Sequence, residues 1–297
     1  MNDPPTRQRT RAGFAWAGVA LLALISLRFL RPTILSNEAV YLLRGRRIVE
    51  PTFLANDWAV GAEAWYQSMS VAFDVLAGAL WASLGDAIPV VLVGRLFAWT
   101  LAVASLARLA STAGVHPGFF LAGAAAWLVG GQAFSAGESI FGAVEQKVFA
   151  YAALFAALDA ACRGRVLRAG VFAGVAIAFH VLVGGWGGAA LGIGVLVRYR
   201  SLREGLRFGL PALLLGAPVM FIAMSSLVAA SPEAPVRYQE SGCVCSWTNA
   251  VSFTRHQFSS GSNSVISRAI ASVRVPRSRS HTKPSWLTMN VMMPEFP

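Results

Sequence analysis

Charged side chains gather between Ser36 and Trp58, directly after the first long apolar run of the chain. A helix is expected from Glu38 to Arg47, with Ser36 or Asn37 as its N-cap. Glu38 then lies in the first turn, where the helix dipole favours an anion. The segment therefore presents a carboxylate that is followed, one or two turns later, by cations.

This pattern of charges suits chemistry on a phosphorylated substrate. A carboxylate can act as the general base for a hydroxyl, and guanidinium groups bind phosphate. Glu38 and Asp57 are therefore candidate catalytic residues, and Arg44 is a candidate substrate-binding residue. The alternative is an ordinary solvated loop whose charges pair with one another.

A second polar stretch, "GESIFGAVEQKVFAY" at 137–151, leads into an apolar run. Glu138 and Glu145 are seven residues apart, which places them on one face of a helix. Ionisable groups at the mouth of a membrane span usually face a cavity or a partner, because contact with lipid is costly. Glu145 is thus a candidate catalytic residue and Lys147 a candidate substrate-binding residue, with simple interfacial anchoring as the alternative.

Two further ionisable residues lie near the ends of apolar runs. His180, in "AFHVLVGGWGG", could be a ligand, a base or a hydrogen-bond donor, or it could be satisfied structurally. Arg95, in "VGRLFAW", could extend along the span toward water or point at a phosphate in a cavity. Both are candidate substrate-binding residues.

Composition indicates a polytopic α-helical membrane protein. The 297 residues are 56% hydrophobic and only 13% charged, with a mean hydropathy of +0.56, whereas soluble domains are about 25% charged. The net charge of +11 is carried almost entirely by arginines that cluster between apolar runs. That distribution is typical of cytoplasmic loop ends, and no nucleic-acid-binding motif accompanies it.

The arginines also predict the orientation, because Lys and Arg near span ends stay in the cytoplasm. The N-terminal segment 1–12 and the turns at 162–168 and 198–207 should be cytoplasmic. All three segments can be cytoplasmic only if one of the apolar windows does not cross the membrane. The window 66–84 is the best candidate to lie at the membrane surface instead, since it contains Asp74 and has aromatic residues near its ends. We expect an interfacial helix at 66–84, an external loop at 36–65 and about seven transmembrane helices, at 13–35, 87–107, 118–136, 147–162, 168–182, 184–197 and 208–230.

The character of the chain changes after about residue 231. The segment 231–297 is rich in serine and lacks sustained helical or strand periodicity. It is predicted to be an irregular tail, either disordered or non-native after a shift of reading frame near residue 238. Cys243, Cys245 and His256 have poor spacing for a metal site.

With these motifs in place, the chain resembles the GT-C superfamily of polytopic glycosyltransferases, which use lipid-linked sugars. The resemblance is carried by "NEAVY" (37–41), by the interfacial helix, by the Arg-initiated span "GRLFAWTLAVASLARL" and by Glu145 after the third span. It implies Glu38 as base, Arg44, Arg95 or Lys147 on the phosphate of a polyprenyl-phosphate sugar, and a divalent metal as possible cofactor. It covers about 14–200 and implies a bacterial inner-membrane protein, either an active enzyme or an inactive fragment.

Two other functions stay open at this point. A transporter would use the glycine-rich, broken helices around His180 at mid-membrane. A structural membrane protein would carry out no chemistry and would tolerate neutral residues at Glu38, Glu145 and Lys147.

Overall fold

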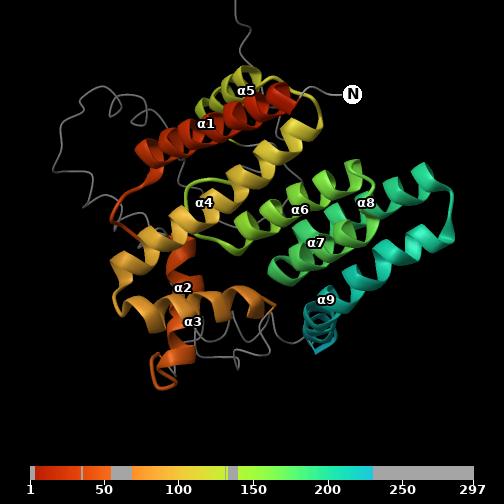
Figure 1. Ribbon diagram of the computed structural model, residues 1–297. Helices are drawn as coiled ribbons and strands as arrows, with labels where there is room; N and C mark the ends of the chain where they lie inside the picture. The colour runs from red at the N-terminus through yellow and green to blue at the C-terminus, as the bar shows by residue number, and fades with distance from the viewer. Residues whose placement is uncertain (1–3, 35, 55–68, 131, 133–139, 230–297) are drawn as a thin grey trace, which may run out of the picture. The chain divides into compact units, whose positions relative to one another are not determined.

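The computed structural model describes residues 4–34, 36–54, 69–130, 132 and 140–229. These residues form nine α-helices and no strand, which confirms the predicted all-α class for this part of the chain. The predicted tail lies outside the described residues. The helices are α1 (Pro4–Phe29), α2 (Ser36–Val49), α3 (Val71–Leu84), α4 (Ala87–Thr112), α5 (Pro117–Val129), α6 (Gln146–Cys162), α7 (Val166–Phe179), α8 (Val181–Tyr199) and α9 (Leu202–Ala229) (Figure 1).

Several of these helices are apolar enough to indicate a membrane protein. Four described segments have both the length and the hydropathy to cross a bilayer: Ala12–Phe29, Ala87–Thr112, Val181–Tyr199 and Leu202–Ser225. The predicted count of about seven spans is not confirmed. Helix α5 has 13 residues and α7 has 14, or about 20 Å each. Helix α5 ends before its predicted window, 118–136, does, whereas α7 has about the length of its window, 168–182.

The region predicted as an interfacial helix contains α3, which packs against α2. The indole Nε1 of Trp81 on α3 donates a hydrogen bond of 2.8 Å to the carbonyl of Leu42 on α2. The two helices approach so closely at Gly45 that an added Cβ would lie 2.4 Å from the Cβ of Ala77. These contacts make α2 and α3 one paired unit, while the interfacial position of α3 stays a prediction.

Helix α4 is at the centre of the main core, where it packs against α1 and α6 (Figure 1). Its buried side chains include Trp99, whose exposed fraction is zero. Phe149, near the start of α6, makes ring contacts with Phe73 on α3, Phe97 on α4 and Phe179 at the end of α7. This aromatic cluster fixes the start of α6 between α3, α4 and the end of α7.

A second core lies between α7 and α9, which meet through small residues. An added Cβ at Gly170 would lie 2.1 Å from the carbonyl oxygen of Phe208, and one at Gly174 would lie 2.8 Å from the Cβ of Leu215. Glycines four residues apart on a helix let two backbones come together, which is a common way of packing membrane helices. The end of α8 joins this core through Val195.

Candidate functional site

Glu38, in the first turn of α2, and Arg95, in the third turn of α4, are fully buried charges, as is Asp74 on α3. Both side chains have zero exposed fraction. Arg95 Nε donates to Glu38 Oε1 at 2.7 Å, and Nη2 lies 2.5 Å from Glu38 Oε2. The pair is therefore bidentate, the strongest geometry for a guanidinium and a carboxylate.

The other hydrogen bonds of this ion pair connect two loops. Arg95 Nη1 donates to the carbonyl of Arg31, and Nη2 donates to the carbonyl of Thr33, both at 2.8 Å. Glu38 Oε1 accepts from the backbone N–H of Val144 at 2.6 Å. The ion pair thus fixes the segment that follows α1 and the segment that precedes α6 against the start of α2.

The segment before α6 is also held from its other side, by Gln132. The Gln132 amide nitrogen donates to the carbonyl of Phe141 at 2.9 Å, and its oxygen accepts from the Phe141 N–H at 2.6 Å. The Phe141 ring lies edge-on to Trp127 of α5, with 5.8 Å between centroids. Residues 140–145 are therefore placed by side chains from α2 and from the end of α5.

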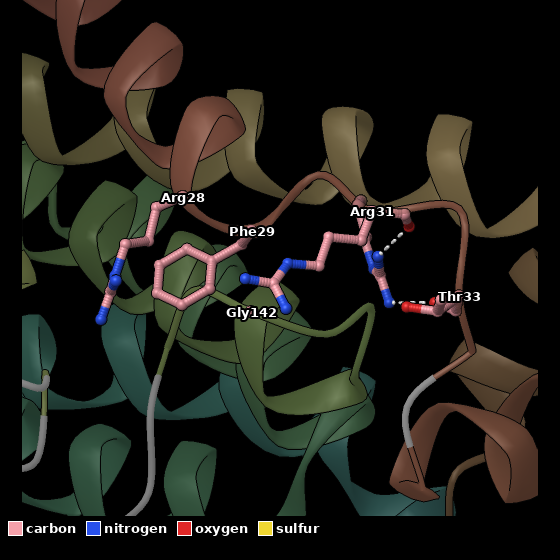
Figure 2. A pocket seen from close by; sticks show the side chains of 6 residues that line it. Arg28, Phe29, Arg31, Thr33 and Gly142 are labelled. Atoms are coloured by element: carbon pink, nitrogen blue, oxygen red, sulfur yellow. Dashed lines mark hydrogen bonds between the residues drawn. The ribbon is translucent and has the colours of Figure 1, made fainter. Parts of the chain in front are cut away.

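These two loops border an open cavity of about 240 Å³. Figure 2 shows the side chains that line it, with Arg28 and Arg31 on either side of Phe29 and dashed lines at the carbonyls of Arg31 and Thr33. The cavity is lined by Arg28, Phe29, Arg31, Thr33, Arg95 and Gly142. Three of these six residues are arginines, and of these only Arg95 pairs with a carboxylate that the structure describes.

Arg28 and Arg31 are the cations in this cavity that can bind a ligand. Neither makes an ion pair with any residue that the structure describes, and the Arg28 guanidinium lies 5.7 Å from the centroid of the Phe29 ring. Arg95 differs, because each of its guanidinium nitrogens already donates to Glu38 or to a carbonyl. The site therefore offers two exposed guanidinium groups beside a third that is fixed.

Sequence reasoning missed Arg28 and Arg31, although the sequence holds a signal for them. Both lie at the end of α1 that is opposite to the basic N-terminus. If the N-terminus is cytoplasmic, as predicted, these arginines are on the outer side, where few are expected. Arginines on the outer side are exceptions to this charge rule, which makes Arg28 and Arg31 candidates for a functional role.

Glu145 and Lys147 form an ion pair at the start of α6, with 2.9 Å between Lys147 Nζ and Glu145 Oε2. Their side chains are 11% and 13% exposed, respectively. Glu145 follows Val144, whose N–H binds Glu38, so the two predicted acidic elements meet in the structure. Of these two carboxylates, only that of Glu145 is open to any solvent.

The donor groups that the structure describes in this region do not fit a divalent cation. Among the described residues, no group of three His, Cys, Asp or Glu side chains comes together as a metal site. Glu38 is bound by Arg95, and Glu145 by Lys147. A cation such as Mg²⁺ or Ca²⁺ needs several free oxygen ligands, so we assign no step to a metal.

The other predicted site residues lie apart from the cavity or outside the described residues. Arg44 is half-buried on α2 and does not line the cavity. His180 separates α7 from α8, and its Nδ1 accepts a hydrogen bond of 3.3 Å from the N–H of Val183. Asp57 and Glu138 are among the residues that the structure does not describe.

No protein-family model, curated protein or solved structure matches this chain. The resemblance to polytopic glycosyltransferases therefore stays a prediction from short motifs. The function has to be argued from the cavity, its two arginines and the apolar helices around them.

Proposed function

We propose that this chain is an integral membrane protein of the glycosyltransferase type, which binds a polyprenyl-phosphate-linked sugar at the cavity beside the end of α1. The observation that supports the proposal is the pair Arg28 and Arg31, two exposed guanidinium groups at the end of a membrane-length helix. Guanidinium groups bind phosphate oxygens in a bidentate geometry. A phosphate joined to an apolar chain is the ligand that matches both the cations and their position.

The size of the cavity favours a headgroup over a whole lipid. Pockets that enclose drug-sized ligands have roughly 300–1,000 Å³, whereas this cavity has about 240 Å³ and is open. We expect the phosphate and part of the sugar to occupy it, and the polyprenyl chain to extend along the apolar helices. Exposed apolar side chains on α1, such as Leu24 and Leu27, provide such a surface.

The proposed reaction is transfer of the sugar to a hydroxyl of an acceptor. The hydroxyl oxygen forms a bond to the anomeric carbon, the bond from that carbon to the phosphate oxygen breaks, and the phosphate keeps the electron pair. A carboxylate accepts the hydroxyl proton. Glu145 suits this role better than Glu38, because both oxygens of Glu38 are already bound in a fully buried pair. We assign Glu38 and Arg95 to positioning the two loops.

Binding tests the assignment of the cavity. Purified full-length protein in detergent would be titrated with a short-chain polyprenyl phosphate and, separately, with the corresponding polyprenol. We expect the polyprenyl phosphate to bind, and Arg28→Gln/Arg31→Gln to weaken it on the order of tenfold or more, the loss of two charged hydrogen bonds. Equal binding of the polyprenol, or an unchanged affinity of the double variant, would reject the cavity as the phosphate site.

Transfer tests the chemistry separately. Glu145→Gln is expected to abolish sugar transfer to a lipid or cell-wall acceptor while binding of the polyprenyl phosphate persists. The transporter alternative predicts instead uptake into reconstituted vesicles that depends on His180. Asp159, the acid near the other end of α6 that such a path would need, is bound by Thr112 and Arg163, which favours the transferase.

A further inference from the structure

A cluster of arginines lies at the other end of α4 and α6 from the cavity. Along α4, Arg95 and Thr112 are 17 residues apart, or about 25 Å, close to the roughly 30 Å of a bilayer core. Thr112 accepts a hydrogen bond of 2.7 Å from Arg163, which follows α6. The two charged regions are therefore separated by about the thickness of a membrane.

The arginines of this cluster come from two turns that lie side by side. An added Cβ at Gly164, in the turn between α6 and α7, would lie 3.5 Å from the Tyr199 hydroxyl at the end of α8. The end of α6, the starts of α7 and α9 and the end of α8 share one apolar core. The arginine cluster consists of seven exposed residues around that core: Arg163, Arg165, Arg168, Arg198, Arg200, Arg203 and Arg207.

The positive charge of the arginine cluster exceeds what its own acids can neutralise. Residues 159–207 contain seven arginines, no lysine and two acids, which leaves five positive charges. Asp159 pairs with Arg163 and Glu204 pairs with Arg207, each at 2.9 Å. The other five arginines make no ion pair with any described residue.

Apolar side chains surround these charges, which points to an amphipathic partner. Leu167, Val197 and Leu202 are 52%, 69% and 76% exposed, respectively, and each is next in sequence to an arginine of the cluster. The cluster also lies where two membrane-length segments, Val181–Tyr199 and Leu202–Ser225, end and begin. Tyr199, half-buried between them, has the amphipathic ring that residues at headgroup depth often have.

We propose that the arginine cluster binds the headgroups of anionic phospholipids at the membrane surface on this side. Basic groups between membrane helices attract such headgroups, and each Lys or Arg near the surface strengthens the attraction. The adjacent leucines and valine would contact the acyl chains while the guanidinium groups bind phosphate. This inference does not depend on the proposed glycosyltransferase function.

The test is lipid retention by the full-length protein taken from nanodiscs that contain phosphatidylglycerol and phosphatidylcholine in equal amounts. Native mass spectrometry would count the lipids of each kind that stay bound. We expect a preference for phosphatidylglycerol that falls on the order of tenfold in Arg165→Gln/Arg168→Gln/Arg203→Gln. The corresponding triple lysine variant keeps the charge, and it should keep most of the preference.

Three outcomes would overturn the proposal. One is equal retention of both lipids by the wild type, and another is the full preference in the glutamine variant together with an unchanged melting temperature. The third is loss of the retention in millimolar inorganic phosphate, which would make the cluster a site for free phosphate instead of lipid. If the glutamine variant does not fold, lipid retention is measured for the lysine variant and for the wild type at rising salt concentration. The preference for phosphatidylglycerol should then fall as salt rises, because screening weakens the attraction between guanidinium groups and headgroups.

Discussion

Two arginine–carboxylate pairs, Arg95–Glu38 and Arg163–Asp159, lie about a membrane thickness apart along α4, and they differ in burial. Arg95 and Glu38 are both fully buried, whereas the side chains of Arg163 and Asp159 are 39% and 15% exposed. The buried pair uses each of its nitrogens and oxygens inside the protein, on two loops and a helix start. The exposed pair binds Thr112 and leaves the neighbouring arginines available to a partner outside the chain.

This difference separates two uses of arginine in one membrane protein. At the cavity, the fixed Arg95 binds the backbone carbonyl of Arg31, one of the two arginines that we propose for phosphate binding. At the arginine cluster, the surplus charge itself forms the binding surface. The first arrangement depends on geometry and the second on charge, so substitutions should affect them differently.

The largest expected effect comes from breaking the buried pair. Arg95→Met would leave the Glu38 carboxylate buried without its partner, which should lower the free energy of unfolding by about 3–5 kcal/mol. The matched control is Arg163→Met, whose partly exposed pair should contribute about 1 kcal/mol or less. Reversible unfolding in mixed micelles measures both. Equal losses would contradict the difference between the two pairs.

The next effect concerns the packing that brings the arginine cluster together. In Gly170→Ala, the new Cβ would lie 2.1 Å from the Phe208 carbonyl oxygen, so α7 and α9 must move apart. We expect a loss of about 1–3 kcal/mol and a weaker preference for phosphatidylglycerol. Gly194→Ala, with no atom within 4 Å of the added Cβ, is the control and should leave both unchanged or raise stability slightly. Identical behaviour of the two variants would argue against this close approach.

An effect of similar size at the cavity tests the role of Gln132. Gln132→Asn keeps the amide and tolerates the positive φ of 60° at this position, but it is too short to make both bonds to Phe141. The loss should be about 1–3 kcal/mol, with reduced affinity for polyprenyl phosphate because Gly142 lines the cavity. Thr100→Ala, on an exposed part of α4, serves as the control. Full affinity in Gln132→Asn would show that the loop needs no such support.

The smallest expected effect is at Asp159. Asp159→Asn removes a partly exposed ion pair and keeps a hydrogen-bond acceptor for Arg163, so stability should fall by about 1 kcal/mol or less. Anionic lipid retention should rise, because the net charge of the cluster increases by one. A large loss of stability, measured by thermal unfolding, would mean that this end of the molecule also depends on its ion pair.

Local patterns predicted the helices well. A helix was predicted from Glu38 to Arg47, and α2 runs from Ser36 to Val49, so that Ser36 lies inside the helix and not at its N-cap. The apolar windows identified each membrane-length segment. The window 118–136 is longer than α5, because hydropathy alone does not mark where a helix ends, whereas the window 168–182 has about the length of α7. The sidedness of the membrane and the inner-membrane location stay predictions.

The contacts of the candidate site were harder to predict. Glu38 and Arg95 are 57 residues apart, and both were singled out, but as a base and as a phosphate ligand. Their pairing depends on how α1, α2 and α4 pack, which periodicity does not reveal. Arg28 and Arg31 were overlooked for a different reason. Arginines are common at the ends of membrane spans, and these two are unusual only because they lie on the predicted outer side.

The central claim is that the cavity and the arginine cluster bind different ligands independently. The most direct test is a reciprocal binding experiment on the full-length protein. Polyprenyl phosphate affinity and phosphatidylglycerol preference would be measured for Arg28→Gln/Arg31→Gln and for Arg165→Gln/Arg168→Gln/Arg203→Gln. We predict that the first variant loses the polyprenyl phosphate and keeps the lipid preference, and that the second does the reverse. Loss of both ligands to the same extent in both variants would contradict the account, because binding would then follow only the total charge.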